Sequence, residues 1–263
     1  MKYKKIFKNL VGSDNLNVVK KTQFTNEFLY ISAFPKSGSS FISLVLSHLL
    51  DTNFVDLIYS HYREQDLYEP KLQEYSDRNT ISKHHTLATT PNIDLFLKYN
   101  IAPIILLRNL PDIVVSLREH ISKTMRWPHF YVPDNFNKIS IEEQHDLLID
   151  IALPWYLFFY TSWTKVKDQK LMPVKFIQYE QFHQNQLNTF KEILDFWNLE
   201  CSESKITESM EVIYNLSSDK NRINKGEMSR GSKILSKSQL ERIVLLTKHY
   251  PDFNFNPILY LNN

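Results

Sequence analysis

Three apolar runs in this chain each lead through a polar turn into a stretch with helical periodicity. The runs are residues 28–33, 102–107 and 173–178, and the helical stretches after them are residues 41–50, 112–120 and 187–197. Short continuous apolar runs are typical of strands buried on both faces, and they are distinct from the spacing of an amphipathic helix. Repeated strand-then-helix order predicts an α/β fold with a central, mostly parallel sheet flanked by helices. Ligands of such sheets bind at the carboxyl ends of the strands.

The turn after the first predicted strand has the composition of a phosphate-binding turn. It reads Phe-Pro-Lys-Ser-Gly-Ser-Ser-Phe over residues 34–41 and holds Gly38, one of four glycines in the chain. An average chain of this length would carry about 18, so each glycine is expected where the backbone approaches a ligand or takes a positive φ. A helix N-terminus binds phosphate through backbone N–H groups. The residues expected to bind it are Lys36, Ser37, Gly38, Ser39 and Ser40; a capped helix beside an incidental lysine is the alternative.

The second predicted strand ends in a group suited to a second phosphate. Arg108 stands at the strand tip, Pro111 and Asp112 suit the first turn of a helix, and Ser116 follows two turns in. Arginine offers a planar fork of donors and serine a directional hydroxyl, so Arg108 and Ser116 are expected to bind one phosphate. An arginine paired with some carboxylate is the alternative.

These two segments resemble motifs of the cytosolic-type sulfotransferases. Residues 35–41 resemble the family's Y-P-K-S-G-T-T-W loop, which grips the 5′-phosphosulfate of 3′-phosphoadenosine 5′-phosphosulfate (PAPS), and residues 108–116 resemble its R-N-P-x-D-x-x-V-S segment, which binds the 3′-phosphate. The resemblance spans about residues 28–245. It implies a P-loop-nucleotide-hydrolase-like sulfotransferase fold, with residues 1–263 as one domain and residues 1–25 as an N-terminal extension. It also implies sulfuryl transfer from PAPS to a hydroxyl or amine of a small-molecule acceptor, with 3′-phosphoadenosine 5′-phosphate (PAP) as product.

Three further segments carry the resemblance along the chain. Residues 83–85, Lys-His-His, resemble the K-x-H before the acceptor site, and residues 179–182, Tyr-Glu-Gln-Phe, resemble a Y-E-D-L whose tyrosine contacts the adenine region. Lys225 and Gly226 resemble the R-K-G that returns to the 3′-phosphate. Tyr179, Lys225 and Gly226 are therefore expected to bind the nucleotide.

The sequence departs from the family pattern at two places. Phe41 replaces the tryptophan that stacks on adenine and still offers an aromatic face. Asn224 stands where arginine is usual, and residues 229–231, Ser-Arg-Gly, replace G-x-W. Arg222 or Arg230 is the candidate for the missing guanidinium.

The resemblance assigns the catalytic roles. His85 is the expected general base, because the pKa of histidine lies near neutrality, and Lys36 is the expected cation at the bridging oxygen. Lys83 is expected to assist near the sulfuryl group, and Ser116 to bond Lys36. His84 is the rival base, since adjacent positions of an extended segment face opposite sides and only one faces the sulfur.

Two aromatic clusters are candidates for the acceptor pocket. Residues 126–133 form an irregular, proline-containing connection, which suits an acceptor lid. Residues 155–160 lie in a long apolar segment, residues 141–166, that predicts a helix or pair of helices bent at Pro154, so this cluster is expected to be mainly core.

Two other functions fit parts of the pattern. A nucleotide-binding protein of the same fold with weak catalysis would explain the altered third motif. A P-loop-type kinase is disfavoured, because G-x-x-x-x-G-K-[ST] needs two glycines before the lysine and Lys36 precedes the single glycine of its turn.

Composition narrows the partners and the compartment. Cys201 is the single cysteine, and Cys and His residues nowhere have zinc-ligand spacing, so we expect a reducing, cytoplasmic setting and no metal. A net charge of +2 gives no global attraction to nucleic acid or an anionic membrane. A leader-type apolar core and an apolar run of about 18 residues are both lacking in the sequence, which predicts no membrane partner. The oligomeric state stays open.

Overall fold

A parallel five-stranded sheet forms the centre of the protein. The computed structural model describes residues 27–127, 129–218 and 228–259, so Arg222, Lys225 and Gly226 lie outside the described residues. The strands are β1 (Phe28–Ala33), β2 (Asn53–Phe54), β3 (Thr80–His84), β4 (Ile104–Leu107) and β5 (Lys175–Gln178). Their order is β2-β3-β1-β4-β5, and every neighbouring pair is parallel. This confirms the predicted fold class.

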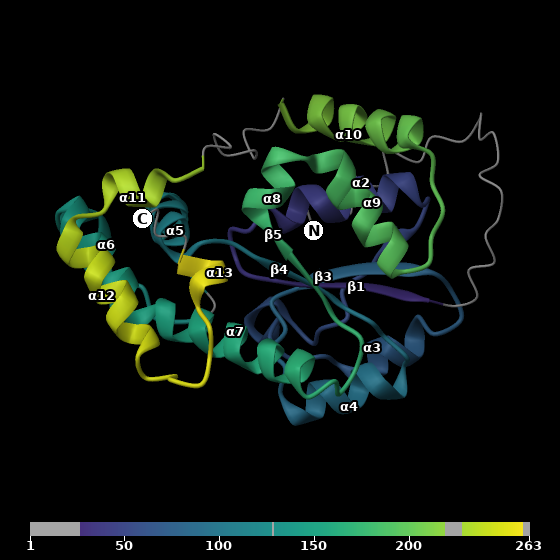
Figure 1. Cartoon of the computed structure of the whole chain (residues 1–263), viewed down its shortest axis with the longest axis horizontal. Coiled ribbons are helices and arrows are strands. Elements are labelled where there is room, and N and C mark those ends of the chain that lie inside the picture. The colour runs from purple at the N-terminus through teal and green to yellow at the C-terminus, as the bar shows by residue number, and fades with distance from the viewer. Residues whose placement is uncertain (1–26, 128, 219–227, 260–263) are drawn as a thin grey trace.

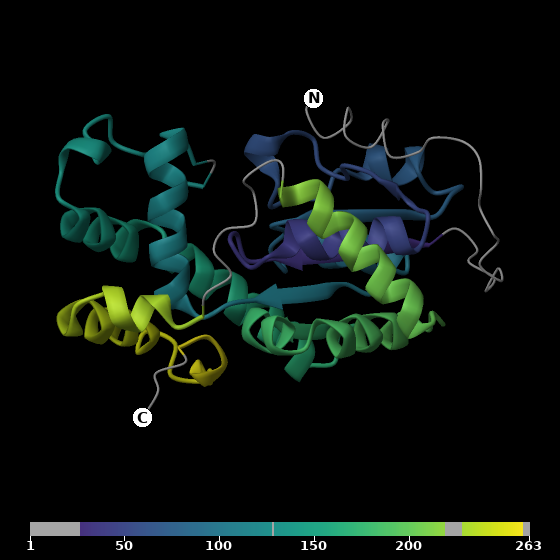
Figure 2. The same cartoon turned by 90° about the horizontal axis from the view of Figure 1, so that it is seen from above.

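Helices cover both faces of the sheet (Figure 1). On one face lie α2 (Ser39–Leu49), α8 (Tyr179–Gln184), α9 (Gln186–Phe196) and α10 (Glu203–Ser218). On the other lie α3 (Glu69–Glu74), α4 (Thr90–Lys98) and α7 (Leu153–Asp168). Figure 2 shows a further group of helices gathered to one side of the sheet. This group contains α5 (Leu110–Thr124), α6 (Ile141–Ile151), α11 (Arg230–Ile234), α12 (Lys237–Thr247) and α13 (Asn256–Leu259), and the short helix η2 (Phe136–Lys138) connects α5 to α6. A second short helix, η1 (His61–Arg63), lies between β2 and α3.

The central strand β1 shows why the apolar runs are continuous. All six of its residues are buried. Leu29 and Ile31 belong to the hydrophobic cluster under α2 and α9, whereas Phe28 and Tyr30 belong to the cluster under α4 and α7. Because successive side chains point to opposite faces and helices cover both, an alternating polar pattern would bury polar groups on one face.

One central strand was not foreseen from its composition. β3 reads Thr-Ile-Ser-Lys-His and lacks an apolar run, yet it pairs with both β1 and β2. Two of its polar side chains find partners inside the fold: the Ser82 hydroxyl donates to the Val55 carbonyl oxygen (2.6 Å), and His84 Nε2 accepts from the Leu57 N–H (3.1 Å). Buried polar groups with such partners are tolerated in a core strand.

Helix boundaries follow the capping residues. The predicted bend in residues 141–166 is present, but the break lies at Ala152, and Pro154 sits in the first turn of α7, where a missing N–H costs no hydrogen bond. Ser236 caps α12, and Gln239 supplies the reciprocal hydrogen bond because it is the third residue after the cap.

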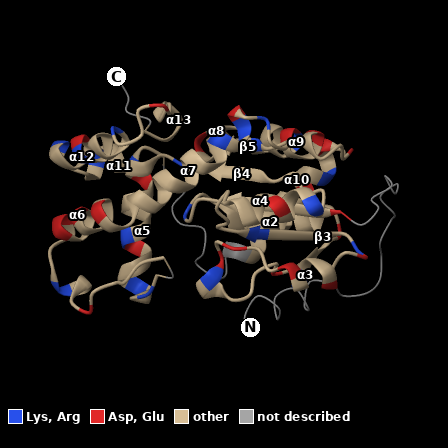
Figure 3. Cartoon of the chain, turned by 90° about the horizontal axis from the view of Figure 1, so that it is seen from below, with Lys and Arg blue, Asp and Glu red and all other residues tan. Residues whose placement is uncertain are grey.

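Charged residues of both signs are interspersed over the outer helices (Figure 3). Within the described parts of the chain, no helix is both long and apolar enough to cross a membrane.

Candidate active site

The predicted site residues emerge from the carboxyl ends of four adjacent strands. In the sheet order β3-β1-β4-β5, these ends lead to His85, Lys36, Arg108 and Tyr179 respectively. Parallel strands bring their carboxyl ends to one edge, so segments that lie far apart in the sequence become neighbours there.

The turn between β1 and α2 has the backbone of an anion cradle. Lys36 and Gly38 both take left-handed conformations, with φ of 70° and 79°. A Cβ on Gly38 would lie 2.9 Å from the Tyr179 ring, so both the φ and the close approach require glycine. α2 begins without a side-chain cap, which leaves its first N–H groups for a ligand.

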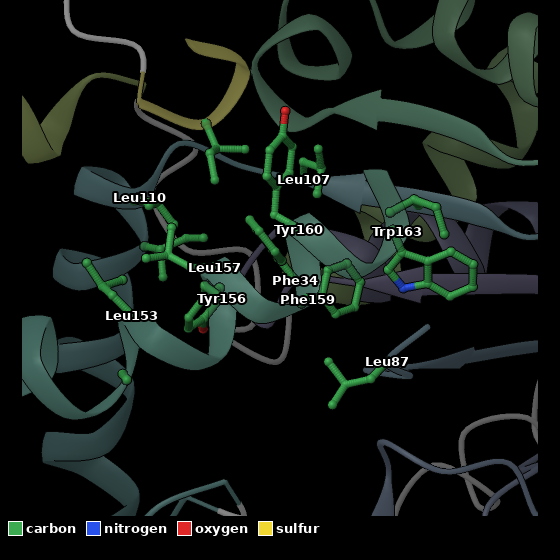
Figure 4. Packing of buried hydrophobic residues seen from close by; sticks show 14 of the residues in the cluster. Phe34, Leu87, Leu107, Leu110, Leu153, Tyr156, Leu157, Phe159, Tyr160 and Trp163 are labelled. Carbon is green, nitrogen blue, oxygen red and sulfur yellow. The ribbon is translucent and has the colours of Figure 1, made fainter. Parts of the chain in front are cut away.

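Helix α7 supports this turn from the opposite side (Figure 4). Phe34 packs edge-on against Tyr156 and Phe159, with ring centroids 5.0 and 5.1 Å away. The Tyr156 hydroxyl donates to the carbonyl oxygen of Pro35 (3.3 Å). Tyr156 and Phe159 are fully buried, which confirms that most of residues 155–160 belong to the core. Through these two side chains, α7 packs against the turn between β1 and α2.

Arg108 lies buried between the turn and α5. Its Nη1 donates to the Lys36 carbonyl oxygen (2.9 Å), its Nη2 lies 3.5 Å from Asp112 Oδ2, and its Cζ lies 4.3 Å from the centroid of the Tyr179 ring. The buried Nε has no hydrogen-bond partner. A buried guanidinium with an unused donor, beside an open helix N-terminus, fits a phosphate group.

Asp112 connects this region to the C-terminal part of the chain. Its carboxylate accepts from the N–H groups of Ser229 (3.1 Å) and Gly231 (2.7 Å). A Cβ on Gly231 would lie 2.2 Å from the Pro111 carbonyl carbon, so glycine is required by contact. Arg230 pairs with Glu119 on α5. Of the two candidate arginines of the third motif, the structure thus places Arg230 on Glu119, and Arg222 is not described.

One face of α5 lies near the charged end of the Lys36 side chain. Ser116 is buried on this helix, and Glu119, His120 and Lys123 follow at the spacing of one helix face. Burial lowers the pKa of Lys36, as do the charges of Arg108 and Lys123, while Glu119 opposes them. Burial and the charges of Lys36 and Lys123 lower the pKa of His120 to about 4. Glu119 and His120 were missed in the sequence, where only their spacing from Ser116 pointed to them.

The two adjacent histidines have different surroundings. His84 Nε2 accepts from the Leu57 N–H (3.1 Å), and burial, followed by the charge of Lys83, lowers the pKa of His84 to about 3. His85 Nδ1 lies 2.6 Å from the Ala33 carbonyl oxygen. A carbonyl oxygen only accepts, so Nδ1 carries the proton and Nε2 keeps its lone pair. Nε2 of His84 is thereby bonded within the core, whereas Nε2 of His85 lies near the carboxylate of Glu64.

A carboxylate and a third histidine stand opposite His85. Glu64 Oε2 lies 4.0 Å from His85 Nε2, and Glu64 Oε1 lies 3.4 Å from His129 Nε2. The His129 ring stacks on Trp155 with centroids 4.7 Å apart. In the sequence, His129 lies within the candidate lid at residues 126–133, but no motif marks His129 or Glu64 individually.

Burial changes the pKa values of His85 and Lys83. It lowers the pKa of His85 to about 4 and also lowers the pKa of Lys83, and in both cases the negative charge of Glu64 acts in the opposite direction. The imidazole of His85 is therefore uncharged at neutral pH. Among the described residues, no cluster of three or more His, Cys, Asp or Glu side chains is placed to hold a metal ion.

Phe41 lies where α10 crosses α2. Its ring is 4.6 Å from Tyr214, tilted by 43°, and 6.1 Å from Phe182. Phe41 thus belongs to an aromatic cluster, in which Tyr214 is a neighbour that the sequence did not single out, and its contact with adenine stays a prediction.

Known proteins share this architecture. The sequence model described as "Sulfotransferase domain" matches residues 27–255. Mouse sulfotransferase SULT7A1, solved with PAP, superposes with a TM-score of 0.65 at 15% identity, over 88% of this chain and 87% of that one. Retinol dehydratase, solved with androsterone and inactive cofactor PAP, gives a TM-score of 0.57 at 15% identity, over 86% and 83% of the two chains. No curated protein matches the chain significantly.

At 15% identity, the two solved structures establish the fold, and the domain match establishes the family. The chain belongs to the sulfotransferase domain family and is a sulfotransferase, as its motifs implied.

Proposed function

We propose that the protein transfers the sulfuryl group of PAPS to a hydroxyl or amine of a small-molecule acceptor, with His85 as general base. The hydrogen bond between His85 Nδ1 and Ala33 carries this proposal. Ala33 is the last residue of β1, so the base is anchored to the strand that leads directly into the phosphate turn. Base and turn are thereby held in one rigid unit.

The donor nucleotide is assigned to the edge formed by β1, β4 and β5. The α2 N-terminus and residues 36–40 would hold the 5′-phosphosulfate, and Arg108 with Ser116 would hold the 3′-phosphate. Phe41 and Tyr179 offer aromatic faces to the adenine. Lys225 and Gly226 remain proposed contacts. The structure described as retinol dehydratase and the mouse sulfotransferase both contain PAP, which supports this assignment.

The chemistry follows from charge and proton movement. PAPS supplies a sulfuryl group that leaves from a phosphate oxygen, which gains negative charge as the bond breaks. Lys36, held at that turn, stabilises this charge, and Ser116 restrains Lys36. His85 Nε2 removes the acceptor's proton, a contribution worth about 10²–10⁴ in rate. Lys83 assists near the sulfuryl group.

The acceptor is assigned to the side of His85 that faces Glu64. Trp127, His129 and Trp155 bring aromatic surface there, and residues 126–133 would serve as its lid. Retinol dehydratase was solved with androsterone or retinol, which supports a small, largely apolar acceptor. Cys201 carries no disulfide, which suits the proposed cytoplasmic location.

Thermal unfolding with nucleotides tests the donor assignment. PAP at a hundredfold excess over its Kd should stabilise the wild type by about 2.7 kcal/mol, whereas ATP and 5′-AMP should have little effect. Arg108→Ala should lose the PAP shift. Arg242→Ala is the matched control, because Arg242 forms surface ion pairs on α12. An equal shift with ATP, or none with PAP, would contradict the proposal and favour a kinase or another nucleotide ligand.

A further inference from the structure

We propose that Glu64 is a positioning residue for His85, balancing the charge that His85 gains when it takes the acceptor's proton, and that His129 holds Glu64 in place for this task. The inference rests on the proposed function and adds two residues to it. Three side chains from the η1 loop, the β3 end and the α5–α6 connection meet at this point.

The hydrogen bonds determine which nitrogen of each histidine carries a proton. His85 donates from Nδ1 to Ala33, so its Nε2 lone pair faces Glu64. The amide nitrogen of Gln65 lies 2.8 Å from His129 Nδ1 and donates to it, so His129 carries its proton on Nε2, toward Glu64 Oε1. Glu64 thus faces the lone pair of His85 Nε2 on one side and the N–H of His129 Nε2 on the other.

The arrangement is buried and rigid. The side chains of His85, Glu64 and His129 expose 11%, 17% and 2% of their surfaces. The nearly parallel stack of His129 on Trp155, at 15°, holds the His129 ring from behind. Charges interact more strongly at such a site than at the surface, because little water screens them.

The charges that face His85 are those of Glu64, Lys83 and His129. Burial alone would raise the pKa of Glu64, but His129, His85 and Lys83 together lower it to about 2. Glu64 is therefore ionised throughout the working range. The carboxylate is the group near His85 whose charge favours imidazolium, since the charge of Lys83 opposes it.

The proposed step balances as follows. The acceptor O–H bond breaks as its proton and His85 Nε2 form an N–H bond, while the acceptor oxygen bonds to sulfur and the bond from sulfur to the departing phosphate oxygen breaks. His85 becomes positive, with its new N–H directed at the acceptor oxygen, and the nearby Glu64 carboxylate balances this charge while it keeps its own charge and takes no proton. His85 later returns the proton to solvent. Because Ala33 occupies Nδ1, the carboxylate acts from the side of the reactive nitrogen.

Glu64→Gln tests this role because it removes the charge and nearly preserves the shape. With PAPS and 2-naphthol as substrates, we expect kcat to fall at least about tenfold. The acid limb of kcat/KM should move at least about one pH unit lower, because the imidazole of His85 is a weaker base when its imidazolium form is less stabilised. Glu64→Asp, which keeps the charge but withdraws it by one methylene, should fall between. Asp66→Asn is the matched control, an exposed carboxylate in the same loop. A loss of kcat with an unmoved acid limb would show a merely structural role and overturn the proposal.

Imidazole nitrogen NMR gives a second, activity-independent measurement. Titration of His85, assigned by comparison with His85→Gln, should give a lower pKa in Glu64→Gln than in wild type, with Glu64→Asp again between. An unchanged His85 pKa in both variants would overturn the proposal. Wild type that neither turns over 2-naphthol nor gains stability from PAP would sink the proposed function instead, and the His85 titration would still decide the role of Glu64.

Discussion

The donor end and the acceptor end of the site are built in different ways. The donor end consists of short contiguous segments, residues 34–41 and 108–116, that each follow a strand and use backbone groups to form the site. The acceptor end places His85 among Glu64, His129 and Trp155, which come from separate loops and from α7. Local geometry suffices for phosphate, whereas the acceptor end depends on how distant segments pack.

The largest expected effect separates the two adjacent histidines of the acceptor end. His85→Ala should lower kcat by about 10²–10⁴ and keep the PAP-induced stabilisation, because the base is lost and the donor end is intact. His84→Ala should keep most of kcat but lower the free energy of unfolding by about 1–3 kcal/mol, since the Leu57 N–H loses its acceptor. Initial rates and thermal unfolding measure both. The opposite pattern would make His84 the base.

Gly231→Ala tests whether the donor end also needs one distant contact. The new Cβ would meet the backbone of Pro111, which cannot move without shifting the start of α5, so we expect a loss of about 1–3 kcal/mol in unfolding free energy. PAP affinity should fall as well, because Asp112 loses its hold on residues 229–231. The exposed neighbour Ser232→Ala is the control and should behave as wild type. Unchanged stability in Gly231→Ala would contradict the packing described.

Gly38→Ala tests the claim that the donor end is made by backbone. A left-handed alanine costs about 1–2 kcal/mol, and the Cβ would press on Tyr179. We expect reduced stability together with weaker PAP binding in calorimetry, while the tautomer and pKa of His85 stay as in wild type. PAP affinity equal to that of the wild type would show that side chains, not the turn's backbone, dominate at this end.

The pH profile gives the smallest effect and probes the acceptor end. The proposed base is the neutral form of His85, and burial lowers the pKa of His85 to about 4, so kcat/KM should fall only as the pH drops through that value. If His85 were exposed to solvent, its pKa would be about 6.5, and kcat/KM would fall to half near that pH instead. An acid limb near that higher value would show that the acceptor end is more hydrated than described.

Stability must be followed in the same experiment. The folded-state pKa of His84 is lowered to about 3, so its contribution to stability is fully present above the unfolded pKa of about 6.5 and declines as the pH falls toward about 3. Circular dichroism at each pH therefore gives the folded fraction by which the rates are divided.

Much of the fold was predictable because its signals are local. The run at residues 28–33 became β1 with the same bounds, and the runs at residues 102–107 and 173–178 became β4 and β5 with later starts. β3 escaped prediction because it lacks an apolar run, and its polar residues Ser82 and His84 find their partners elsewhere in the sequence, at Val55 and Leu57. Periodicity detects apolar burial and is blind to buried polar pairs.

By itself, the sequence determined the strand-then-helix order at β1, β4 and β5, the turn at Gly38, and the positions of Arg108 and Ser116, because a strand–turn–helix unit is specified within about ten residues. Only the tertiary structure decided the remaining features. It gave His84 and His85 different hydrogen-bond partners, at Leu57 and Ala33, bonded Asp112 to Gly231, and brought Glu64 close to His85 and His129. These contacts join residues far apart in the chain, and their energies depend on burial, which no short motif encodes.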